Sequence, residues 1–287
     1  MTTKVGIIGM GVMGGSLLLN LKASLPDVSI HAISRGESGQ QWARDNGAES
    51  AGSNILDLPH DLDFLFLTSP SNVLESQAQT LKKWPGKALI SDMASAKGWI
   101  VPRLDDILKD RYLSCHPMCG SEKTGTQGAK EDLYNRKAVI LTPGPSSTKE
   151  ALEVLSVFWE KLGCRISIKT PEDHDQAVAW VSHMPHLVVP AILQAIRKAE
   201  GTEGSIFDIA GTGLRDVSRL AGSNPELWSD IFLENKMAVR EAIQSMQEEL
   251  QVCLDMLEKK EDNFTQEMGS YLQDARAIRQ NMGLSDI

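Results

Sequence analysis

A histidine followed directly by a proline stands in the run C-H-P-M-C-G-S-E at residues 115–122. The preceding Tyr112, Leu113 and Ser114 predict a short apolar strand that ends near His116. Proline restricts the backbone, and imidazole is the side chain that exchanges protons closest to neutral pH. The position therefore indicates a general base held at the end of a strand. The alternative is a partly exposed or internally satisfied histidine without a chemical role, which is the commoner kind.

The chain opens with V-G-I-I-G-M-G-V-M-G at residues 5–14, which has the glycine spacing of a dinucleotide-binding turn. Residues 5–8 predict a buried strand, and the leucine-rich residues 16–25 predict the helix after the turn. In G-x-G-x-x-G the first glycine permits the tight turn, the second lets a pyrophosphate approach, and the third lets the helix pack on the strand. The N-terminus of that helix would offer free N–H groups to the phosphates. The predicted cofactor contacts in this turn are Gly9, Gly11, Met13 and Gly14.

The end of the second strand, predicted over residues 29–33, distinguishes between the two nicotinamide cofactors. NAD-binding chains usually carry an acidic residue there for the ribose hydroxyls, whereas this chain has Ser34 and Arg35. A carboxylate would repel a 2′-phosphate, but a hydroxyl and a guanidinium would bind it. We therefore predict NADP as the cofactor, with NAD as the alternative because Glu37 lies close by.

Length, composition and charge fit a cofactor enzyme of two domains. The chain has 287 residues, of which 41% are hydrophobic and 23% charged, as is ordinary for a soluble globular protein. The net charge of −9 argues against nucleic acid and anionic membranes as partners, because both bind basic surfaces. We also expect no apolar stretch long enough to span a bilayer. An anionic small-molecule substrate needs only a local cationic pocket and is compatible with this charge.

The four cysteines are too few and too scattered for a disulfide framework, which favours a reducing cytoplasm. A predicted strand lies where a signal peptide would be, which favours the same location. Cys115 and Cys119 flank His116, and a zinc site with His183 or His186 is conceivable. Their spacing is not one of the common zinc patterns, so we predict no metal.

Up to residue 169, short apolar strands alternate with helical stretches, which is typical of a parallel sheet covered by helices. The strands are predicted over residues 5–8, 29–33, 64–68, 88–91, 139–142 and 165–169. Ligands bind beyond the carboxyl ends of such strands. Ser69 and Pro70, which would line the cofactor, and Ser95 and His116 all fall at these ends. We therefore expect the polar three at one edge of one sheet, as the rim of an active site.

Helical periodicity takes over after this point, so we divide the chain into a NADP-binding Rossmann domain, residues 1–169, and an all-α domain, residues 170–287. The stretch 172–199 predicts a helix with kinks at Pro185 and Pro190.

Asn224 and Pro225 predict the start of a long helix further along the chain. Apolar residues recur along it at alternating spacings of four and three: Val239, Ile243, Met246, Leu250, Cys253 and Leu257. Such a narrow seam indicates helix-on-helix packing, either within the monomer or between two subunits.

Five motifs, in this order, resemble those of the prephenate/arogenate dehydrogenases of tyrosine biosynthesis. They are G-M-G-V-M-G at 9–14, S-D-M-A-S-A-K at 91–97, C-H-P-M-C-G-S-E at 115–122, E-D-H-D-Q-A-V-A-W-V-S-H-M-P-H at 172–186 and G-L-R-D-V-S-R-L-A-G-S-N-P-E-L-W at 213–228. The resemblance covers nearly the whole chain. It implies a Rossmann domain followed by a helical domain that forms a homodimer, and NAD(P)-dependent oxidative decarboxylation of a cyclohexadienyl substrate.

The resemblance also implies roles for single residues. His116 matches the histidine that accepts the proton of the substrate's ring hydroxyl, and Ser95 matches a serine that hydrogen-bonds near that hydroxyl. Arg219 matches the arginine that anchors a substrate carboxylate, and Asp216 would steer it if the segment is helical. The other implied pocket residues are His183, His186 and Trp228, which line the site, and Glu122, which with Asp216 orders its entrance.

Two other classes are compatible with the residues. A β-hydroxyacid-type NADP dehydrogenase shares the G-x-G-x-M-G opening and would use a lysine base, for which Lys198 and Lys236 are available. A catalytically silent NADP-sensing protein would bind the cofactor, consume no substrate and dock through the long helix. The sequence leaves open whether prephenate or arogenate is the substrate, since the two differ only in a keto or amino group.

Overall fold

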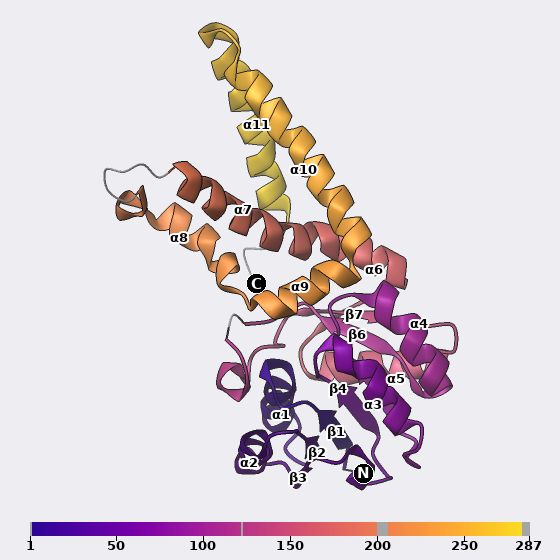
Figure 1. The fold of residues 1–287 in the computed structure, drawn as a ribbon. Helices are drawn as coiled ribbons and strands as arrows, with labels where there is room; N and C mark the ends of the chain where they lie inside the picture. The colour runs from indigo at the N-terminus through magenta and orange to yellow at the C-terminus, as the bar shows by residue number, and fades with distance from the viewer. Residues whose placement is uncertain (1, 122, 200–205, 283–287) are drawn as a thin grey trace. The chain divides into compact units, whose positions relative to one another are not determined.

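A computed structural model of the chain describes residues 2–121, 123–199 and 206–282. The chain forms two compact units that divide between Lys236 and Met237. Every strand in the described residues lies in the first unit, and helices α6 to α9 follow the last strand within that unit (Figure 1). The predicted order, an α/β dinucleotide-binding fold followed by helices, is confirmed.

Five parallel strands form the first sheet, in the order β3-β2-β1-β4-β5. They are β1 (Lys4–Ile8), β2 (Ser29–Ile33), β3 (Ser50–Gly52), β4 (Phe64–Leu67) and β5 (Leu89–Asp92). The helices that follow strands of this sheet are α1 (Val12–Ser24), α2 (Glu37–Asp45), α3 (Ser71–Leu81) and α4 (Lys97–Leu108). The sequence pattern did not predict the three-residue β3. The strand order reverses between β1 and β4, and such a reversal creates a ligand crevice beyond the carboxyl ends of those strands.

A second sheet of three strands carries His116. It consists of β6 (Ser114–Pro117), β7 (Ala138–Thr142) and β8 (Arg165–Ile168), and α5 (Lys149–Lys161) connects the last two. β8 is parallel to β7, but β6 is antiparallel to it, with His116 opposite Ile140. The prediction that Ser69, Ser95 and His116 share one parallel sheet is therefore wrong for His116. In the described residues of the segment 118–137 the structure has the short turn η3 (Thr126–Gly128) and no helix of the kind that usually makes a parallel crossover.

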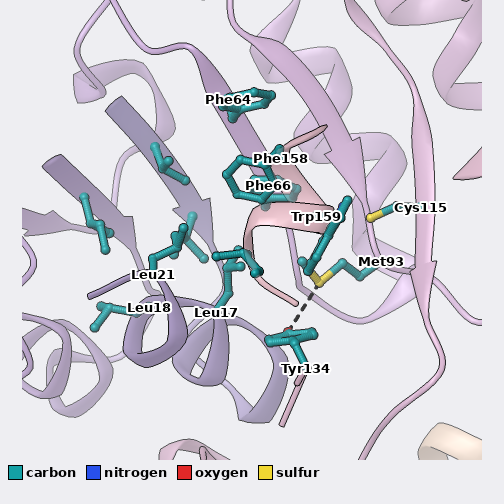
Figure 2. Packing of buried hydrophobic residues seen from close by; sticks show 14 of the residues in the cluster. Leu17, Leu18, Leu21, Phe64, Phe66, Met93, Cys115, Tyr134, Phe158 and Trp159 are labelled. Carbon is teal, nitrogen blue, oxygen red and sulfur yellow. Dashed lines mark hydrogen bonds between the residues drawn. The ribbon is translucent and has the colours of Figure 1, made fainter. Parts of the chain in front are cut away.

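Successive residues of one strand point to opposite faces of the first sheet and so enter two different cores. Phe64 and Phe66 belong to the core beneath α1 and α5, whereas Leu65 and Leu67 belong to the core beneath α3 and α4. In the first core the ring of Phe158 from α5 lies 4.6 Å from Phe64 and 5.0 Å from Phe66, between centroids (Figure 2). Burial on both faces holds the strand ends, and so the site edge, in place.

After the second sheet the chain continues as one helical run of three parts. These are α6 (Pro171–Val178), the π-helical turn η4 (Ala179–His183) and α7 (Met184–Ala199). The π turn ends two residues before Pro185, whose missing N–H leaves the carbonyl four residues earlier without its α-helical donor. A kink was predicted at Pro185, and there the structure changes from a π turn to an α-helix. A kink was also predicted at Pro190, but α7 continues through that residue.

By length and composition, the run Pro171–Ala199 is long and apolar enough to cross a bilayer. The expectation that no apolar stretch reaches this length is wrong, because the helix continues through both prolines. The run nevertheless buries His174, Asp175 and His183, whose polar atoms bond to other parts of the first unit. Its buried face is therefore part of a polar site within the protein.

The first unit ends with η5 (Ile206–Ile209), α8 (Thr212–Ser218), η6 (Arg219–Gly222) and α9 (Pro225–Glu234). The side chain of Asn224 accepts a hydrogen bond from the Leu227 N–H at 2.9 Å, and Pro225 lies in the first turn, so the predicted helix start is confirmed. The prediction of one long helix is wrong, because this helix ends at Glu234 and the apolar seam lies on the next one, α10 (Lys236–Leu257).

The second unit consists of the long helices α10 (Lys236–Leu257) and α11 (Glu261–Asn281). The hydroxyl of Tyr271 in α11 donates to the carboxylate of Glu249 in α10 at 3.3 Å. The apolar seam predicted on α10 is only partly covered, since Leu250 is 51% and Leu257 61% exposed.

Candidate active site

The glycine turn after β1 has a backbone that only glycine adopts easily. Gly9 has φ +109°, and a Cβ at this position would lie 2.9 Å from the backbone nitrogen of Ser69. The hydroxyl of Thr68 donates to the carbonyl of Gly9 at 2.6 Å, and the hydroxyl of Ser69 accepts from the Gln77 amide at 2.8 Å. Thr68 thus holds this turn from the end of β4, while Ser69, predicted to line the cofactor, lies against it and is bonded to α3, which Pro70 directly precedes.

The other two glycines differ in what surrounds them. A Cβ on Gly14 would lie 2.0 Å from the carbonyl oxygen of Gly9, so this position needs glycine for the packing of α1 on β1. A Cβ on Gly11 would meet no atom within 4 Å, so Gly11 faces open space at the start of α1. No side chain caps this helix end, and its free N–H groups suit an anion. The turn therefore fits the pyrophosphate of a dinucleotide, whereas the carbonyl of Met13 accepts from the hydroxyl of Tyr134 at 2.7 Å.

Ser34 and Arg35 follow β2 at the predicted position. Ser34 is half-buried against α2, where a Cβ on Gly39 would lie 2.4 Å from the Ser34 hydroxyl oxygen. Arg35 and Glu37 are exposed. The edge beside the ribose position of such a fold thus carries a hydroxyl and an exposed guanidinium.

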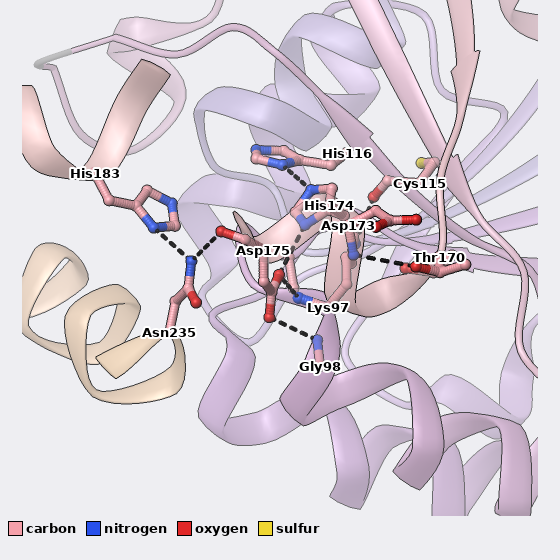
Figure 3. Close-up of polar contacts among 12 residues, drawn as sticks. Lys97, Gly98, Cys115, His116, Thr170, Asp173, His174, Asp175, His183 and Asn235 are labelled. Atoms are coloured by element: carbon pink, nitrogen blue, oxygen red, sulfur yellow. Dashed lines mark hydrogen bonds and ion pairs between the residues drawn. The ribbon is translucent and has the colours of Figure 1, made fainter. Parts of the chain in front are cut away.

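His116 is buried, and its ring bonds to a second histidine. Its Nδ1 lies 2.8 Å from Nε2 of His174 in α6, and Nδ1 of His174 lies 2.8 Å from Oδ1 of Asp175 (Figure 3). Burial, with smaller contributions from the charges of His174 and Lys97, lowers the pKa of His116 well below its usual value. His116 is therefore a neutral imidazole at physiological pH, as a general base must be.

A buried ion pair fixes the backbone next to His116. The ammonium of Lys97 lies 2.8 Å from Oδ1 of Asp92 and donates to the carbonyl of Cys115 at 2.7 Å. Oδ2 of Asp92 accepts from the hydroxyls of Tyr112 and Ser114 at 2.6 and 2.5 Å. Breaking such a fully buried pair by removing one partner is costly, about 3–5 kcal/mol. This network ties β5, α4 and β6 together around the base.

A second cluster is formed by residues of η4, α7 and α9, together with Asn235 at the C-terminal end of α9. The ring of His183 is 5.9 Å from Trp228 between centroids at an angle of 82°, and its Nδ1 accepts from the amide of Asn235 at 3.1 Å. Burial lowers the pKa of His183 to about 4, so its neutral ring carries a hydrogen on Nε2. That Nε2 is buried without a hydrogen-bond partner among the described residues. Burial lowers the pKa of His186, and the positive charge of Arg219 lowers it further. Arg219 begins η6, which packs against α7.

The remaining predicted residues are not joined to these clusters. Ser95 is half-buried in the loop between β5 and α4, and no hydrogen bond links it to His116 in the described part of the chain. Asp216 lies 3.7 Å from the guanidinium of its neighbour Arg215, not against Arg219 as expected. Arg215, Asp216, Ser218 and Arg219 line one hollow of about 670 Å³. Glu122 lies outside the described residues.

Sequence reasoning missed three residues that the structure places in the site, namely His174, Asp175 and Asn235. His174 and Asp175 belong to the quoted run at 172–186, and a His-Asp pair in the first turns of a helix was the available signal. Nothing local marks Asn235, which donates from its amide both to the carbonyl of Asp175 at 2.8 Å and to His183.

Cys115 and Cys119 are not grouped with other metal-binding side chains in the described residues. Burial raises the pKa of Cys115 and Cys119 to about 12, so neither is a thiolate at neutral pH. Within the described residues no three His, Cys, Asp or Glu side chains are grouped to hold a metal ion.

A doubly wound sheet with a glycine turn at its strand reversal, beside a buried neutral histidine, defines a nicotinamide-dependent oxidoreductase. Residues 17–168 match the sequence model of the prephenate dehydrogenase nucleotide-binding domain, and residues 170–272 match that of the prephenate dehydrogenase dimerization domain. The chain belongs to the prephenate dehydrogenase family, and it is an enzyme.

Individual relatives agree with this assignment. Cyclohexadienyl dehydrogenase of Zymomonas mobilis is 30% identical over 82% of this chain and 82% of its own length. Prephenate dehydrogenase of Bacillus subtilis is 30% identical over 80% of this chain, and the match spans 63% of the Bacillus protein.

Two solved structures have the same fold throughout. Prephenate dehydrogenase from Aquifex aeolicus, in complex with hydroxyphenyl propionate and NAD+, is 30% identical with a TM-score of 0.89, over 98% of this chain and 99% of that one. Synechocystis arogenate dehydrogenase is 28% identical with a TM-score of 0.81, over 97% and 99%.

Family membership decides against both alternative classes. A 3-hydroxyisobutyrate dehydrogenase from Salmonella typhimurium shares only the fold, at 13% identity and a TM-score of 0.56. The lysines that a β-hydroxyacid enzyme would need, Lys198 and Lys236, are both exposed.

Proposed function

We propose that this enzyme catalyses the NADP-dependent oxidative decarboxylation of a cyclohexadienyl substrate, arogenate or prephenate, in tyrosine biosynthesis. The observation that carries the proposal is the buried, neutral His116, whose Nδ1 is engaged by His174 and whose Nε2 has no hydrogen bond within the described residues. The named activities of the Zymomonas, Bacillus and Synechocystis relatives support this substrate class.

In this reaction the protein must accept one proton from the substrate and orient the carboxylate that leaves. The substrates carry a hydroxyl at C4 of the ring and a carboxylate at C1. The nicotinamide, when bound, supplies the hydride acceptor. Nε2 of His116 takes the hydroxyl proton as the hydride leaves C4. The bond between C1 and its carboxylate then breaks, carbon dioxide leaves, and the electron pair makes the ring aromatic. The resulting phenolate regains the proton from His116.

The second cluster is suited to hold an anionic ring. Arg219 offers a cation for a substrate carboxylate, in a charge-assisted bond worth about 1.5–3 kcal/mol. The unpartnered Nε2–H of His183 would donate to a substrate oxygen, since a buried donor without a partner is costly unless a ligand meets it. His186 and Trp228 would line the pocket, Ser95 would hydrogen-bond near the C4 hydroxyl, and Glu122 and Asp216 would order the entrance.

We propose NADP as the preferred cofactor because Ser34 and Arg35 offer a hydroxyl and a guanidinium where an acid would select NAD. The Aquifex relative was solved with NAD+, so the proposal of NADP rests on Ser34 and Arg35 of this chain and not on that structure. Gly9, Gly11, Met13, Gly14, Ser69 and Pro70 complete the proposed cofactor site.

We further propose a cytoplasmic homodimer, divided into a cofactor-binding domain of residues 1–169 and a dimerisation domain of residues 170–287. The match to a dimerization domain and the exposed seam residues Leu250 and Leu257 support a dimer through the C-terminal helices. The net charge of −9 supports a small anionic substrate rather than nucleic acid or an anionic membrane as the partner.

The test is turnover by the purified enzyme with arogenate and with prephenate, each with NADP+ and with NAD+. Formation of reduced cofactor together with an equal amount of carbon dioxide is the expected result. Reduced cofactor without carbon dioxide would contradict the decarboxylation, and no turnover with either substrate would contradict the substrate class.

A further inference from the structure

Three side chains form a continuous chain of hydrogen bonds that begins at the proposed base. His116 comes from β6, while His174 and Asp175 are consecutive residues of α6. Both contacts, from His116 to His174 and from His174 to Asp175, are 2.8 Å long (Figure 3). His174 is fully buried, so water does not compete for either bond.

Asp175 is held as a hydrogen-bond acceptor by the start of another helix. Its Oδ1 accepts from the backbone N–H of Lys97 at 2.7 Å, and its Oδ2 accepts from that of Gly98 at 2.8 Å. These are the first residues of α4, whose own N-cap residue, Ala96, provides no side-chain cap. The carboxylate of a distant helix therefore caps α4, and the dipole of α4 favours its negative charge.

The acceptor role of Asp175 determines where the protons on both histidines lie. His174 must carry its hydrogen on Nδ1 to donate to the carboxylate, which leaves its Nε2 with a lone pair. His116 must then carry a hydrogen on Nδ1 to donate to that lone pair. The neutral His116 ring therefore has its lone pair on Nε2, which is the form that accepts a substrate proton.

The opposite arrangement would be unfavourable in this site. A hydrogen on Nε2 of His116 would place a lone pair on its Nδ1, so His174 would have to donate from its Nε2. A neutral His174 would then turn a lone pair toward the carboxylate of Asp175. Two acceptors facing one another without water lose a hydrogen bond and repel.

We propose that His174 and Asp175 are positioning residues that fix the tautomer of His116 and share the proton it takes from the substrate. The inference rests on the proposed function, in which His116 is the base. When Nε2 of His116 gains the substrate proton, the bond between its Nδ1 and hydrogen breaks and a bond to Nε2 of His174 forms. The positive charge moves from the ring of His116 to the ring of His174, next to the carboxylate of Asp175. The step is a proton transfer, and neither ring is oxidised or reduced. The reverse transfer returns the proton to the phenolate.

The surrounding charges favour this inward transfer. Burial lowers the pKa of both histidines, but for His174 the hydrogen bond and the charge of Asp175 act in the opposite direction. The pKa of His116 has no such compensation, because the charges of His174, Lys97 and His183 all lower it. The charged groups that act on His174 are Asp175 on its own helix, Lys97 on α4 and Asp92 on β5. Lys97 and Asp92 pair with each other, so Asp175 is the carboxylate left to stabilise an imidazolium at His174.

The experiment compares His174→Gln with wild type, using His60→Gln as a matched control on an exposed histidine. Glutamine offers an amide oxygen to Nδ1–H of His116 but cannot carry a proton. We expect kcat to fall about tenfold or more, KM to change little, and the acid limb of the kcat–pH profile to move to lower pH. Asp175→Asn should move the limb in the same direction. A kcat within twofold of wild type with an unmoved acid limb would overturn the relay.

A measurement on the wild-type protein covers the case in which a variant does not fold. Nitrogen NMR of labelled histidine should find the Nδ1–H tautomer on both His116 and His174, and an Nε2–H tautomer on His116 would overturn the proposal. The proposed function fails separately, if wild type turns over neither substrate or if His116→Asn retains activity.

Discussion

The ring of His186 stacks on the indole of Trp228, with ring centroids 3.7 Å apart and planes 15° from parallel. The contact joins α7 to α9 and presents aromatic faces beside the positive charge of Arg219. Flat apolar walls with one nearby cation are the surroundings that an anionic ring requires, since the walls bind the ring and the cation orients its carboxylate.

Replacing Arg219 tests that anchor. Arg219→Ala should raise KM for the substrate with a smaller effect on kcat, because an interaction made equally in ground and transition states is lost. Steady-state kinetics at saturating cofactor gives both constants. Arg215→Ala is the matched control, since Arg215 lines the same hollow but is paired with Asp216. An unchanged KM in the Arg219 variant, or an equal rise in the Arg215 variant, would place the carboxylate elsewhere.

Removing the base should leave binding intact and slow the chemistry. His116→Asn should lower kcat by at least about 10²-fold, the usual worth of general-base catalysis, while affinity for the cofactor barely changes. Turnover and cofactor binding are measured on the same preparation, with His60→Asn as the control. A variant that keeps more than a tenth of wild-type kcat would refute the assignment.

The cofactor preference should reverse when the two residues that follow β2, Ser34 and Arg35, are replaced. The double replacement Ser34→Asp and Arg35→Ala adds an acceptor for ribose hydroxyls, removes the phosphate partner and introduces repulsion. We expect kcat/KM to favour NADP in wild type and NAD in the double variant. If wild type uses NAD equally well, Arg35 does not meet a phosphate and Glu37 would serve the ribose instead.

Two glycines of the same turn should respond differently to a methyl group. Gly14→Ala should destabilise the fold, because its Cβ would lie 2.0 Å from the Gly9 carbonyl, a backbone atom. Gly11→Ala should keep the melting temperature of wild type, since its Cβ meets nothing within 4 Å, but should weaken cofactor binding by filling the approach of the pyrophosphate. Thermal unfolding and cofactor titration of both variants separate these effects. Normal cofactor affinity in Gly11→Ala would show that the phosphates bind elsewhere.

Stability should fall in mild acid because buried histidines must stay neutral. Burial lowers the pKa of His183 from 6.5 to about 4, so between these values the unfolded chain binds a proton that the folded protein does not. The contribution is fully present above pH 6.5 and declines as pH falls toward 4, by at most about 1.4 kcal/mol per pH unit. His183→Gln keeps an acceptor for Asn235 and does not titrate. Its free energy of urea unfolding should decline less steeply across this window, and identical slopes would contradict the burial of a neutral ring.

The sequence was sufficient to predict the elements that depend on contacts between residues close together in the chain. The turn at Gly9 to Gly14 and the cap at Asn224 each need only a few consecutive residues, because the atoms that must meet lie within one or two turns of the chain. The buried strands followed from apolar runs for the same reason, and β3 was missed because three residues carry too little pattern.

The hydrogen bonds of the site depend on distant segments and could not be anticipated in this way. His116 and His174 are 58 positions apart, and their contact depends on how α6 packs against α4 and β7. β6 runs antiparallel to β7 because the described residues between the two strands form no crossover helix, and no residue within β6 signals this direction. Asn235 interrupts a stretch that has helical periodicity on both sides, and only its burial against Asp175 and His183 explains the break.

The π turn η4 sets the angle between the two histidine groups on one helical rod. An α-helix advances about 100° per residue, and a π turn takes up one additional residue without advancing the residues after it. Deleting Val181, whose side chain is 68% exposed, would therefore let the turn close as an ordinary α-helix that keeps His174 against His116 and His186 against Trp228. If the turn closed as an α-helix with all its residues kept, the part after it would rotate by about 100°, and His186 would leave Trp228. The π turn, rather than the side chain of Val181, thus aligns the two histidine groups, and both replacing and deleting Val181 should leave that alignment intact.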